Sequence, residues 1–322
     1  MHKGIDFIIA LFVGSLSLPL WATTYSPSSS SELTTALSSI NPGDTVNLQA
    51  GVTYIGNFTI SRKGTSDQPI IITGPASAIL DGDSLSSGYT LYLKNAQYIE
   101  LSGFTINHGQ KGLMLDNAKH NTFSGLTIKN TGMEGFHFRK YSQYNRLENS
   151  TIENTGKTKA KYGEGIYVGS ANSNWCSYTS CKPDHSDNNV ISGNHITNTT
   201  AEAIDIKEGT SNTTITDNTI NGYGIAAVDS LIDVKGDSAI INNNNVYIST
   251  SNDNVENGIT IHNVYGDWGQ GNSAGGNSID LSNASGANYA IKSYSGATDT
   301  TVCEDNTATG AQLTNIDTES CD

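Results

Sequence analysis

The chain has 322 residues and carries 31 acidic against 17 basic side chains, a formal net charge of −14 at pH 7. This excess of acid argues against nucleic acid as a partner. Glycine contributes 33 residues and proline only 6, in a sequence rich in Asn, Ser and Thr. Such a composition is typical of disorder unless it follows a pattern, and here it does.

The first residues predict export. Lys3 precedes the apolar run IIALFVGSLSLPL, and a small residue, Ala22, follows it, which is the layout of a signal peptide over residues 1–22. The run is shorter than the roughly 20 apolar residues of a membrane span, so we expect no membrane insertion. We expect residues 23–322 to form one secreted or periplasmic domain, as a monomer.

The N-terminal part of the mature chain predicts a cap. Residues 28–42 place Leu33, Ala36, Leu37 and Ile40 at helical spacing after a run of serines, which favours a short amphipathic helix. Such a helix would cover the open end of a repetitive structure.

The rest of the chain repeats one unit of roughly 20 to 30 residues. Examples are KGLMLDNAKHNTFSGLTIKNTG (111–132), EGFHFRKYSQYNRLENSTIENTG (134–156) and EAIDIKEGTSNTTITDNTINGYG (202–224). Each unit holds two short runs of alternating apolar residues bounded by Gly, Asn, Asp or Ser, which indicates strands. The pattern predicts an all-β, single-stranded right-handed parallel β-helix; a β-propeller fits less well.

Three further features belong to this solenoid. Asn recurs at one place in successive units, at Asn194, Asn218, Asn244 and Asn277, which predicts an internal ladder of amides. Residues 172–187 interrupt the repeat and are expected to form a loop, and residues 295–322 a C-terminal cap. The four cysteines fit an oxidising compartment, and the preferred pairing, one of three, joins Cys176 to Cys181 and Cys303 to Cys321.

Equivalent residues of successive coils lie about 4.8 Å apart, so the stacked columns predict neighbours. Three outward columns are expected: Met114, His137, Tyr167, Asp205, Asp233 and Thr260; Asp116, Arg139, Gly169, Lys207, Lys235 and His262; and Glu134, Glu164, Glu202, Ser230 and Asn257. Stacked like charges repel unless they are compensated. Glu164, Glu202, Asp205 and Asp233 are therefore candidate calcium ligands, with a plain salt-bridge lattice as the alternative. Stacking also predicts a lowered pKa for one of Lys207 and Lys235.

The basic residues concentrate between Lys111 and Lys161, which favours an anionic chain as the ligand. Gly169 leaves room for that ligand to approach the sheet. The candidate substrate-binding residues around it are His137, Tyr167, Lys161, His262 and Trp175.

The segments SSELTTALSSINPGDTVNLQAGVTY, GTSDQPIIITGPASAILDGDSL and YIELSGFTI resemble the opening coils of secreted chondroitinase-B-like and alginate lyases. The resemblance implies the pectate-lyase-like β-helix and β-elimination from an acidic glycan. In that family a calcium-binding Glu precedes the catalytic Lys by five positions, as Glu202 precedes Lys207 here. A second Glu of the family pattern falls on Thr200, and Lys235 stands where the family has an Arg.

The expected function is thus a polysaccharide lyase. Lys207 is the expected base, and Lys235 or Arg139 the assisting cation. A glycoside hydrolase, a C5-epimerase and a non-catalytic glycan-binding β-helix remain as alternatives, because one fold serves many reactions.

Overall fold

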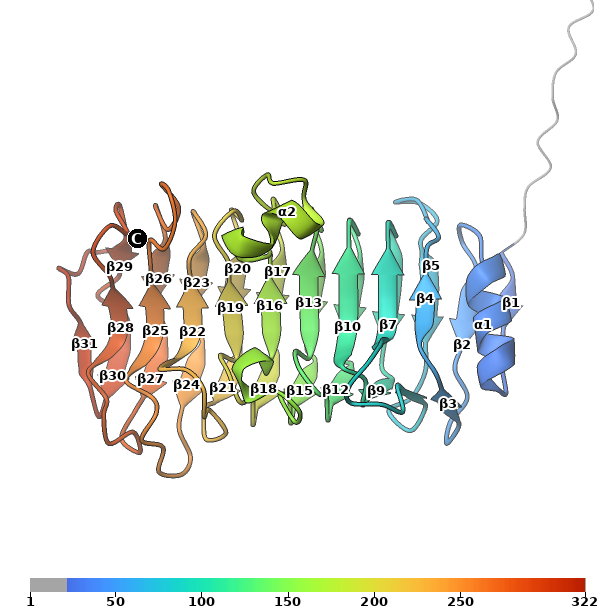
Figure 1. The fold of residues 1–322 in the computed structure, drawn as a ribbon, viewed down its shortest axis with the longest axis horizontal. Coiled ribbons are helices and arrows are strands. Elements are labelled where there is room, and N and C mark those ends of the chain that lie inside the picture. The colour runs from blue at the N-terminus through green and yellow to red at the C-terminus, as the bar shows by residue number, and fades with distance from the viewer. Residues whose placement is uncertain (1–21, 322) are drawn as a thin grey trace, which may run out of the picture.

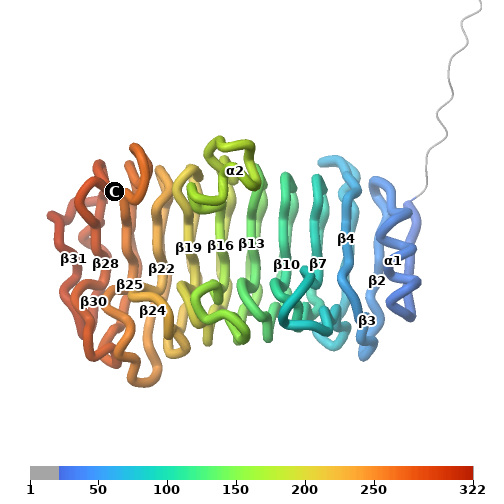
Figure 2. Tube along the Cα trace, viewed as in Figure 1, coloured from blue at the N-terminus to red at the C-terminus, as the bar shows by residue number. Residues whose placement is uncertain are grey.

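The computed structural model describes residues 22–321. The predicted signal peptide therefore lies outside the described residues, apart from Ala22. Three long parallel sheets wind into a right-handed solenoid, as predicted, and its coils stack along one axis (Figures 1 and 2). Among residues 22–321 no helix is long and apolar enough to cross a membrane.

Each coil contributes one strand to each sheet. Sheet 1 contains β4 (Phe58–Ile60), β7 (Tyr89–Lys94), β10 (Lys111–Asp116), β13 (Phe136–Arg139), β16 (Ile166–Val168), β19 (Ile204–Ile206), β22 (Ser230–Val234), β25 (Asn257–Ile261), β28 (Tyr289–Ser293) and β31 (Gln312–Thr314). Sheet 2 contains β1 (Thr24–Tyr25), β2 (Thr45–Asn47), β5 (Ile70–Thr73), β8 (Ile99–Ser102), β11 (Thr122–Ser124), β14 (Arg146–Glu148), β17 (Val190–Ser192), β20 (Thr214–Thr216), β23 (Ile240–Asn242), β26 (Ser273–Gly275) and β29 (Thr301–Val302). Sheet 3 contains β3 (Thr53–Ile55), β6 (Ile79–Asp81), β9 (Thr105–Asn107), β12 (Thr127–Lys129), β15 (Thr151–Glu153), β18 (His195–Thr197), β21 (Thr219–Asn221), β24 (Asn245–Tyr247), β27 (Ser278–Asp280) and β30 (Thr307–Thr309).

The expectation of two strands per unit is wrong, because a coil has three. The second predicted run is divided by a residue with positive φ that turns the chain between sheets 2 and 3. Gly125, at φ 61°, separates β11 from β12, and Asp217, at φ 57°, separates β20 from β21. Glycine, asparagine and aspartate adopt this conformation more readily than other residues.

The core consists of the alternating apolar residues of every strand. Leu113, Phe136, Ile166, Ile204 and Ile232 stack through successive strands of sheet 1 and are fully buried. The predicted inward positions are therefore confirmed. Because these side chains point inward, the residues between them line the outer face of sheet 1.

The predicted asparagine ladder is also present. The Oδ1 atoms of Asn218, Asn244 and Asn277 accept hydrogen bonds from the backbone N–H groups of Asn194, Asn218 and Asn244 at 2.9–3.0 Å. Asn306 extends this ladder by one coil. A second ladder of Asn121, Asn145 and Asn189 runs through earlier coils and was not predicted.

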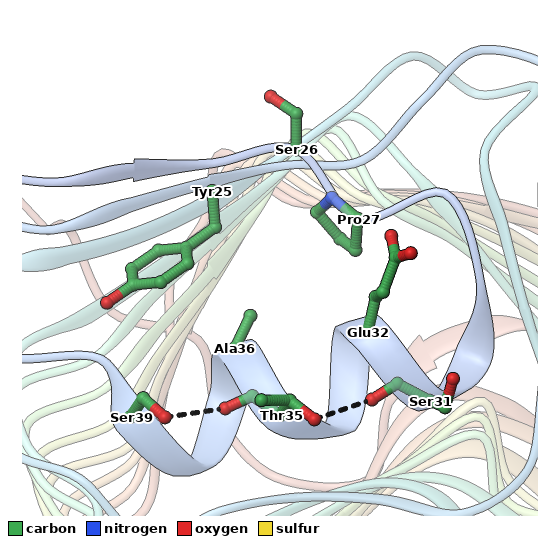
Figure 3. Close-up of a pocket in the computed structure, with 8 residues that line it drawn as sticks. All are labelled: Tyr25, Ser26, Pro27, Ser31, Glu32, Thr35, Ala36 and Ser39. Carbon is green, nitrogen blue, oxygen red and sulfur yellow. Dashed lines mark hydrogen bonds between the residues drawn. The ribbon is translucent and has the colours of Figure 1, made fainter.

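Helix α1 (Ser30–Ser39) caps the N-terminal end, as predicted, and Leu33, Ala36 and Leu37 face the core. The Ser29 hydroxyl accepts from Glu32 N–H at its N-terminus. A cavity of about 350 Å³ lies beside this helix (Figure 3). Its lining holds one charged side chain, Glu32, and no group of residues suited to catalysis among those described.

Residues 172–187 leave the solenoid between β16 and β17 and contain the 3₁₀ turn η2 (Asn172–Asn174) and helix α2 (Trp175–Tyr178). They lie at the end of sheet 1 where its strands finish (Figure 1). A second loop, residues 156–163 with η1 (Ala160–Tyr162), precedes β16 and lies at the opposite end of that strand. Both predicted disulfides, Cys176–Cys181 and Cys303–Cys321, are present.

Candidate active site

Two lysines and two aspartates from adjacent coils form an ion-pair cluster on the outer face of sheet 1. Lys207 Nζ lies 2.6 Å from Asp205 Oδ2, and Lys235 Nζ lies 2.9 Å from Asp205 Oδ1 and 2.5 Å from Asp233 Oδ2. Asp205 is paired with Asp233 in the strand register, so the predicted column is confirmed. Asp205 is buried, whereas the side chains of Lys207 and Lys235 keep 16% and 12% of their surface exposed.

The predicted lowering of a lysine pKa is wrong. Burial alone would lower the pKa of Lys207 and Lys235, but the charge of Asp205 outweighs it and raises both above the usual range. The reason is that the carboxylate lies between the two ammonium groups and compensates for their repulsion. Both lysines are therefore protonated at neutral pH.

Three of the four predicted calcium ligands gather next to this cluster. Glu164, Glu202 and Asp205 each place one carboxylate oxygen within 4.8 Å of the others. All three are buried, and Glu164 Oε2 has no hydrogen-bond partner among residues 22–321. Burial and the nearby charges of Glu134 and Asp205 raise the pKa of Glu164 well above its usual range. Burial and then Asp205 raise the pKa of Glu202 to about 7.

This acidic triad suits a hard cation by ligand type, since calcium takes carboxylate oxygens. An orphaned buried carboxylate oxygen is what a bound cation would satisfy. Asp233, the fourth predicted ligand, lies outside the triad: Lys235 neutralises it, and His262 Nε2 lies 3.4 Å from its Oδ1.

Tyr167 lies beside Lys207, whose Nζ is 5.1 Å from the centre of the tyrosine ring. The His137 and Tyr167 rings pack edge to face, with their centres 4.5 Å apart. His137 Nε2 donates to Gly169 O at 2.9 Å, which fixes the imidazole orientation. Burial lowers the pKa of His137 and raises that of Tyr167 well above its usual range, so the imidazole is neutral and the phenol protonated.

Arg139 lies two coils from Lys207 and is anchored by a bidentate ion pair. Its Nε and Nη2 donate to the two oxygens of Asp116 at 2.7 and 3.0 Å. Tyr92 Oη also donates to Asp116, at 2.7 Å. Gly169 occupies the coil between Arg139 and Lys207, so Arg139 does not touch the lysine cluster.

The remaining predicted substrate-binding residues are dispersed. Lys161 is exposed on loop 156–163, and its Nζ lies 5.9 Å from the Tyr162 ring centre. The His262 ring stacks on Tyr294 at 3.9 Å. Trp175 is 6% exposed and donates from Nε1 to Ser170 O at 2.8 Å, so its ring packs within the protein.

The insertion is held against the solenoid by Asp184. Its fully buried carboxylate accepts hydrogen bonds from Lys140 N, Tyr141 N and Ser170 Oγ at 2.7–3.0 Å. This attachment presents Tyr178 to sheet 1, where its ring lies 4.1 Å from Arg139 Cζ.

Sequence reasoning assigned no site role to four residues that build this region: Tyr162, Tyr178, Asp116 and Lys111. The first two stand on loops, for which a strand repeat gives no register. The register did place Asp116 above Arg139, and opposite charges in one column were the available signal.

The arrangement defines a class of protein: a parallel β-helix that carries a cluster of lysines and buried carboxylates on the outer face of one sheet. The family model described as periplasmic copper-binding protein (NosD) matches residues 86–255. The structure resembles an alginate lyase from Paenibacillus sp. str. FPU-7, with 38% identity, a TM-score of 0.84, and coverage of 91% of this chain and 97% of that one. No curated protein matches in a sequence search.

The chain therefore belongs to the NosD family over residues 86–255 and, over nearly its whole length, to the family of the Paenibacillus alginate lyase. Pectate lyase Pel9A (17% identity, TM-score 0.53, covering 91% of this chain and 80% of that one) shares the fold. So does DFA-IIIase from Arthrobacter chlorophenolicus A6 (12% identity, TM-score 0.55, covering 93% and 86%). At these identities the last two show the fold alone.

Proposed function

We propose that the protein is a secreted polysaccharide lyase that cleaves an acidic, uronate-containing glycan of the alginate type by β-elimination. The observation that carries the proposal is the 38% identity to an alginate lyase over 91% of the chain. The lysine cluster on sheet 1 supports it, because it places two protonated ammonium groups side by side on one outer face, where they can bind a uronate carboxylate.

β-Elimination requires neutralisation of the C5 carboxylate, removal of the C5 proton and protonation of the departing glycosidic oxygen. Lys235 is the assisting cation in this proposal, because it adjoins Lys207 and Arg139 does not. Lys207 removes the proton, and Tyr167, a protonated phenol whose ring centre lies 5.1 Å from Lys207 Nζ, donates to the leaving oxygen. The C–O bond breaks as the C4–C5 double bond forms.

Lys207 is protonated in the free protein, so it becomes a base only after it loses a proton. Activity should therefore rise with pH through the neutral range.

Glu164, Glu202 and Asp205 would hold calcium when it is present. A bound calcium ion would supply additional positive charge toward the substrate carboxylate. The lysines, Tyr167 and the bound glycan keep the same roles in the steps described above.

The test is a panel of alginate, pectate, glucuronan, chondroitin and dermatan, with and without a chelator, read for unsaturated ends by ultraviolet absorbance. Unsaturated products from alginate support the proposal. Saturated ends would indicate a hydrolase, inversion at C5 without cleavage an epimerase, and binding without any reaction a glycan-binding protein.

A further inference from the structure

A pocket of about 210 Å³ opens on sheet 1 beside the lysine cluster. Its floor is formed by strands β10, β13 and β16. Its walls include Tyr162 from loop 156–163 and Tyr178 from α2, two segments at opposite ends of β16. Tyr162 is 43% and Tyr178 36% exposed, so both rings present apolar surface to a ligand. Paired aromatic rings with a polar end are suited to the faces and hydroxyls of a sugar.

Arg139 supplies an anion-binding group in this pocket. Its hydrogen bonds within residues 22–321 go to Asp116 and use one Nε–H and one Nη2–H of the guanidinium. A guanidinium has five N–H donors, so the remaining ones are available to a ligand. Asp116 and the Tyr178 ring fix the guanidinium plane, which pre-organises it for a planar carboxylate.

The charges around the pocket also favour an anion. Lys111 Nζ lies 2.6 Å from Glu134 Oε1, and Lys140 Nζ lies 3.4 Å from Asp116 Oδ2. The three cations Lys111, Arg139 and Lys140 thus face two carboxylates, Glu134 and Asp116. Asp116 is shared by Arg139 and Lys140, so this group of five side chains carries a net charge of +1 when all are ionised.

The pocket is continuous with the proposed reaction point. Tyr167 lines it and also contacts Lys207. The Gly169 coil lies between Arg139 and Lys207. These two residues are therefore two inter-strand spacings apart, which is about 10 Å. A Cβ at Gly169 would lie 2.5 Å from Thr210 Cγ2 and 3.5 Å from Lys207 Cβ. Glycine therefore leaves the surface between Arg139 and Lys207 free of a side chain.

We propose that this pocket is the subsite for the sugar adjoining the cleaved linkage, on the side of the N-terminal coils. Arg139 binds the carboxylate of that sugar, and Tyr162 and Tyr178 clamp its ring from the two loops. The proposal rests on the proposed function, because it assigns a neighbouring uronate to the same chain that Lys207 attacks. It makes the enzyme selective for two consecutive uronates rather than for one.

The test measures binding without turnover. A Lys207→Met variant is titrated calorimetrically with a saturated alginate oligosaccharide and with the same oligosaccharide after reduction of its carboxyl groups. Tyr162→Ala and Tyr178→Ala are then added singly, each beside its Tyr→Phe counterpart. Tyr144→Ala, an exposed ring outside the pocket, is the matched control.

Each Tyr→Ala change should weaken binding on the order of 5- to 10-fold, while Tyr→Phe and Tyr144→Ala leave it within about 2-fold. Carboxyl reduction removes the carboxylates at both Lys235 and Arg139, so it should weaken binding at least about 10-fold more with Arg139 present than after Arg139→Lys, which loses the fork. Equal affinities across the tyrosine variants, or the same preference for the carboxylated ligand with Arg139 and with Arg139→Lys, would overturn the subsite. These binding results are independent of catalysis: if they hold while the wild type makes no unsaturated ends, the proposed lyase reaction is wrong and the subsite stands.

Discussion

Replacing Asn218 by alanine should destabilise the solenoid more than any exposed asparagine change. The side chain accepts from Asn194 N and Nδ2 at 2.9 and 3.0 Å. It donates to Ile191 O at 2.9 Å and to Asn244 Oδ1 at 3.0 Å. All four hydrogen bonds are buried. Alanine removes each of them and leaves the partner groups buried, where water cannot replace the lost bond. At about 1 kcal/mol each, the loss is about 4 kcal/mol.

The assay is equilibrium unfolding in urea, followed by circular dichroism, with Asn245→Ala as the matched control. Asn245 is the neighbour of ladder residue Asn244, is exposed, and makes no side-chain hydrogen bond within residues 22–321. Its replacement should cost less than about 0.5 kcal/mol. Similar losses for the two variants, or a loss below about 1 kcal/mol for Asn218→Ala, would refute the view that the ladder stabilises the coils.

Three further predictions concern the outer face of sheet 1. Asp205 raises the pKa of Lys207, so Asp205→Asn should move the rising limb of the kcat/KM profile to lower pH; a limb that stays in place or moves up argues against Lys207 as the base. Burial alone would raise the pKa of Asp116, but Arg139 lowers it to about 2. The ionised Asp116 therefore stabilises the fold by about 2 kcal/mol above pH ~4, and this stabilisation is lost as the pH falls through ~2. Acid unfolding of Asp116→Asn should lack this loss between pH ~4 and ~2, and an unchanged slope would contradict it. Calcium should raise the melting temperature of the wild type and not of Glu164→Gln, and an equal rise in both would remove the triad as its site.

The solenoid could be predicted from the sequence because every coil repeats the same pattern of inward apolar residues and polar turn residues. The alternation of apolar residues places Leu113 and its counterparts in the core. The recurrence of asparagine once per coil indicates a turn at which a buried side-chain amide bonds the backbone of the adjacent coil. The third strand of each coil could not be predicted, because the alternation of apolar residues continues on both sides of Gly125. The turn there depends on the positive φ of that one residue.

The stacking of coils allowed prediction of which residues of the candidate site lie on adjacent strands. Register alone brings Asp205 over Asp233 and Ile206 over Val234, and Lys207 and Lys235 are the next residues on the two adjacent coils. The pKa of Lys207 depends instead on side-chain rotamers, which place Asp205 between the ammonium groups, and a column gives no rotamers. Trp175 and Tyr178 are both aromatic residues of one insertion, and the contacts of the folded loop determine that the first packs inside while the second faces Arg139.

The most direct test of the central claim compares the wild type, Lys207→Met and Lys129→Met on alginate, with ultraviolet absorbance as the measure of unsaturated ends. Lys129 lies in sheet 3 and provides a matched loss of one lysine away from the site. The account predicts strong absorbance for the wild type and Lys129→Met, and at least about a 1,000-fold lower rate for Lys207→Met with unchanged circular dichroism. A Lys207→Met variant as active as the wild type would contradict it.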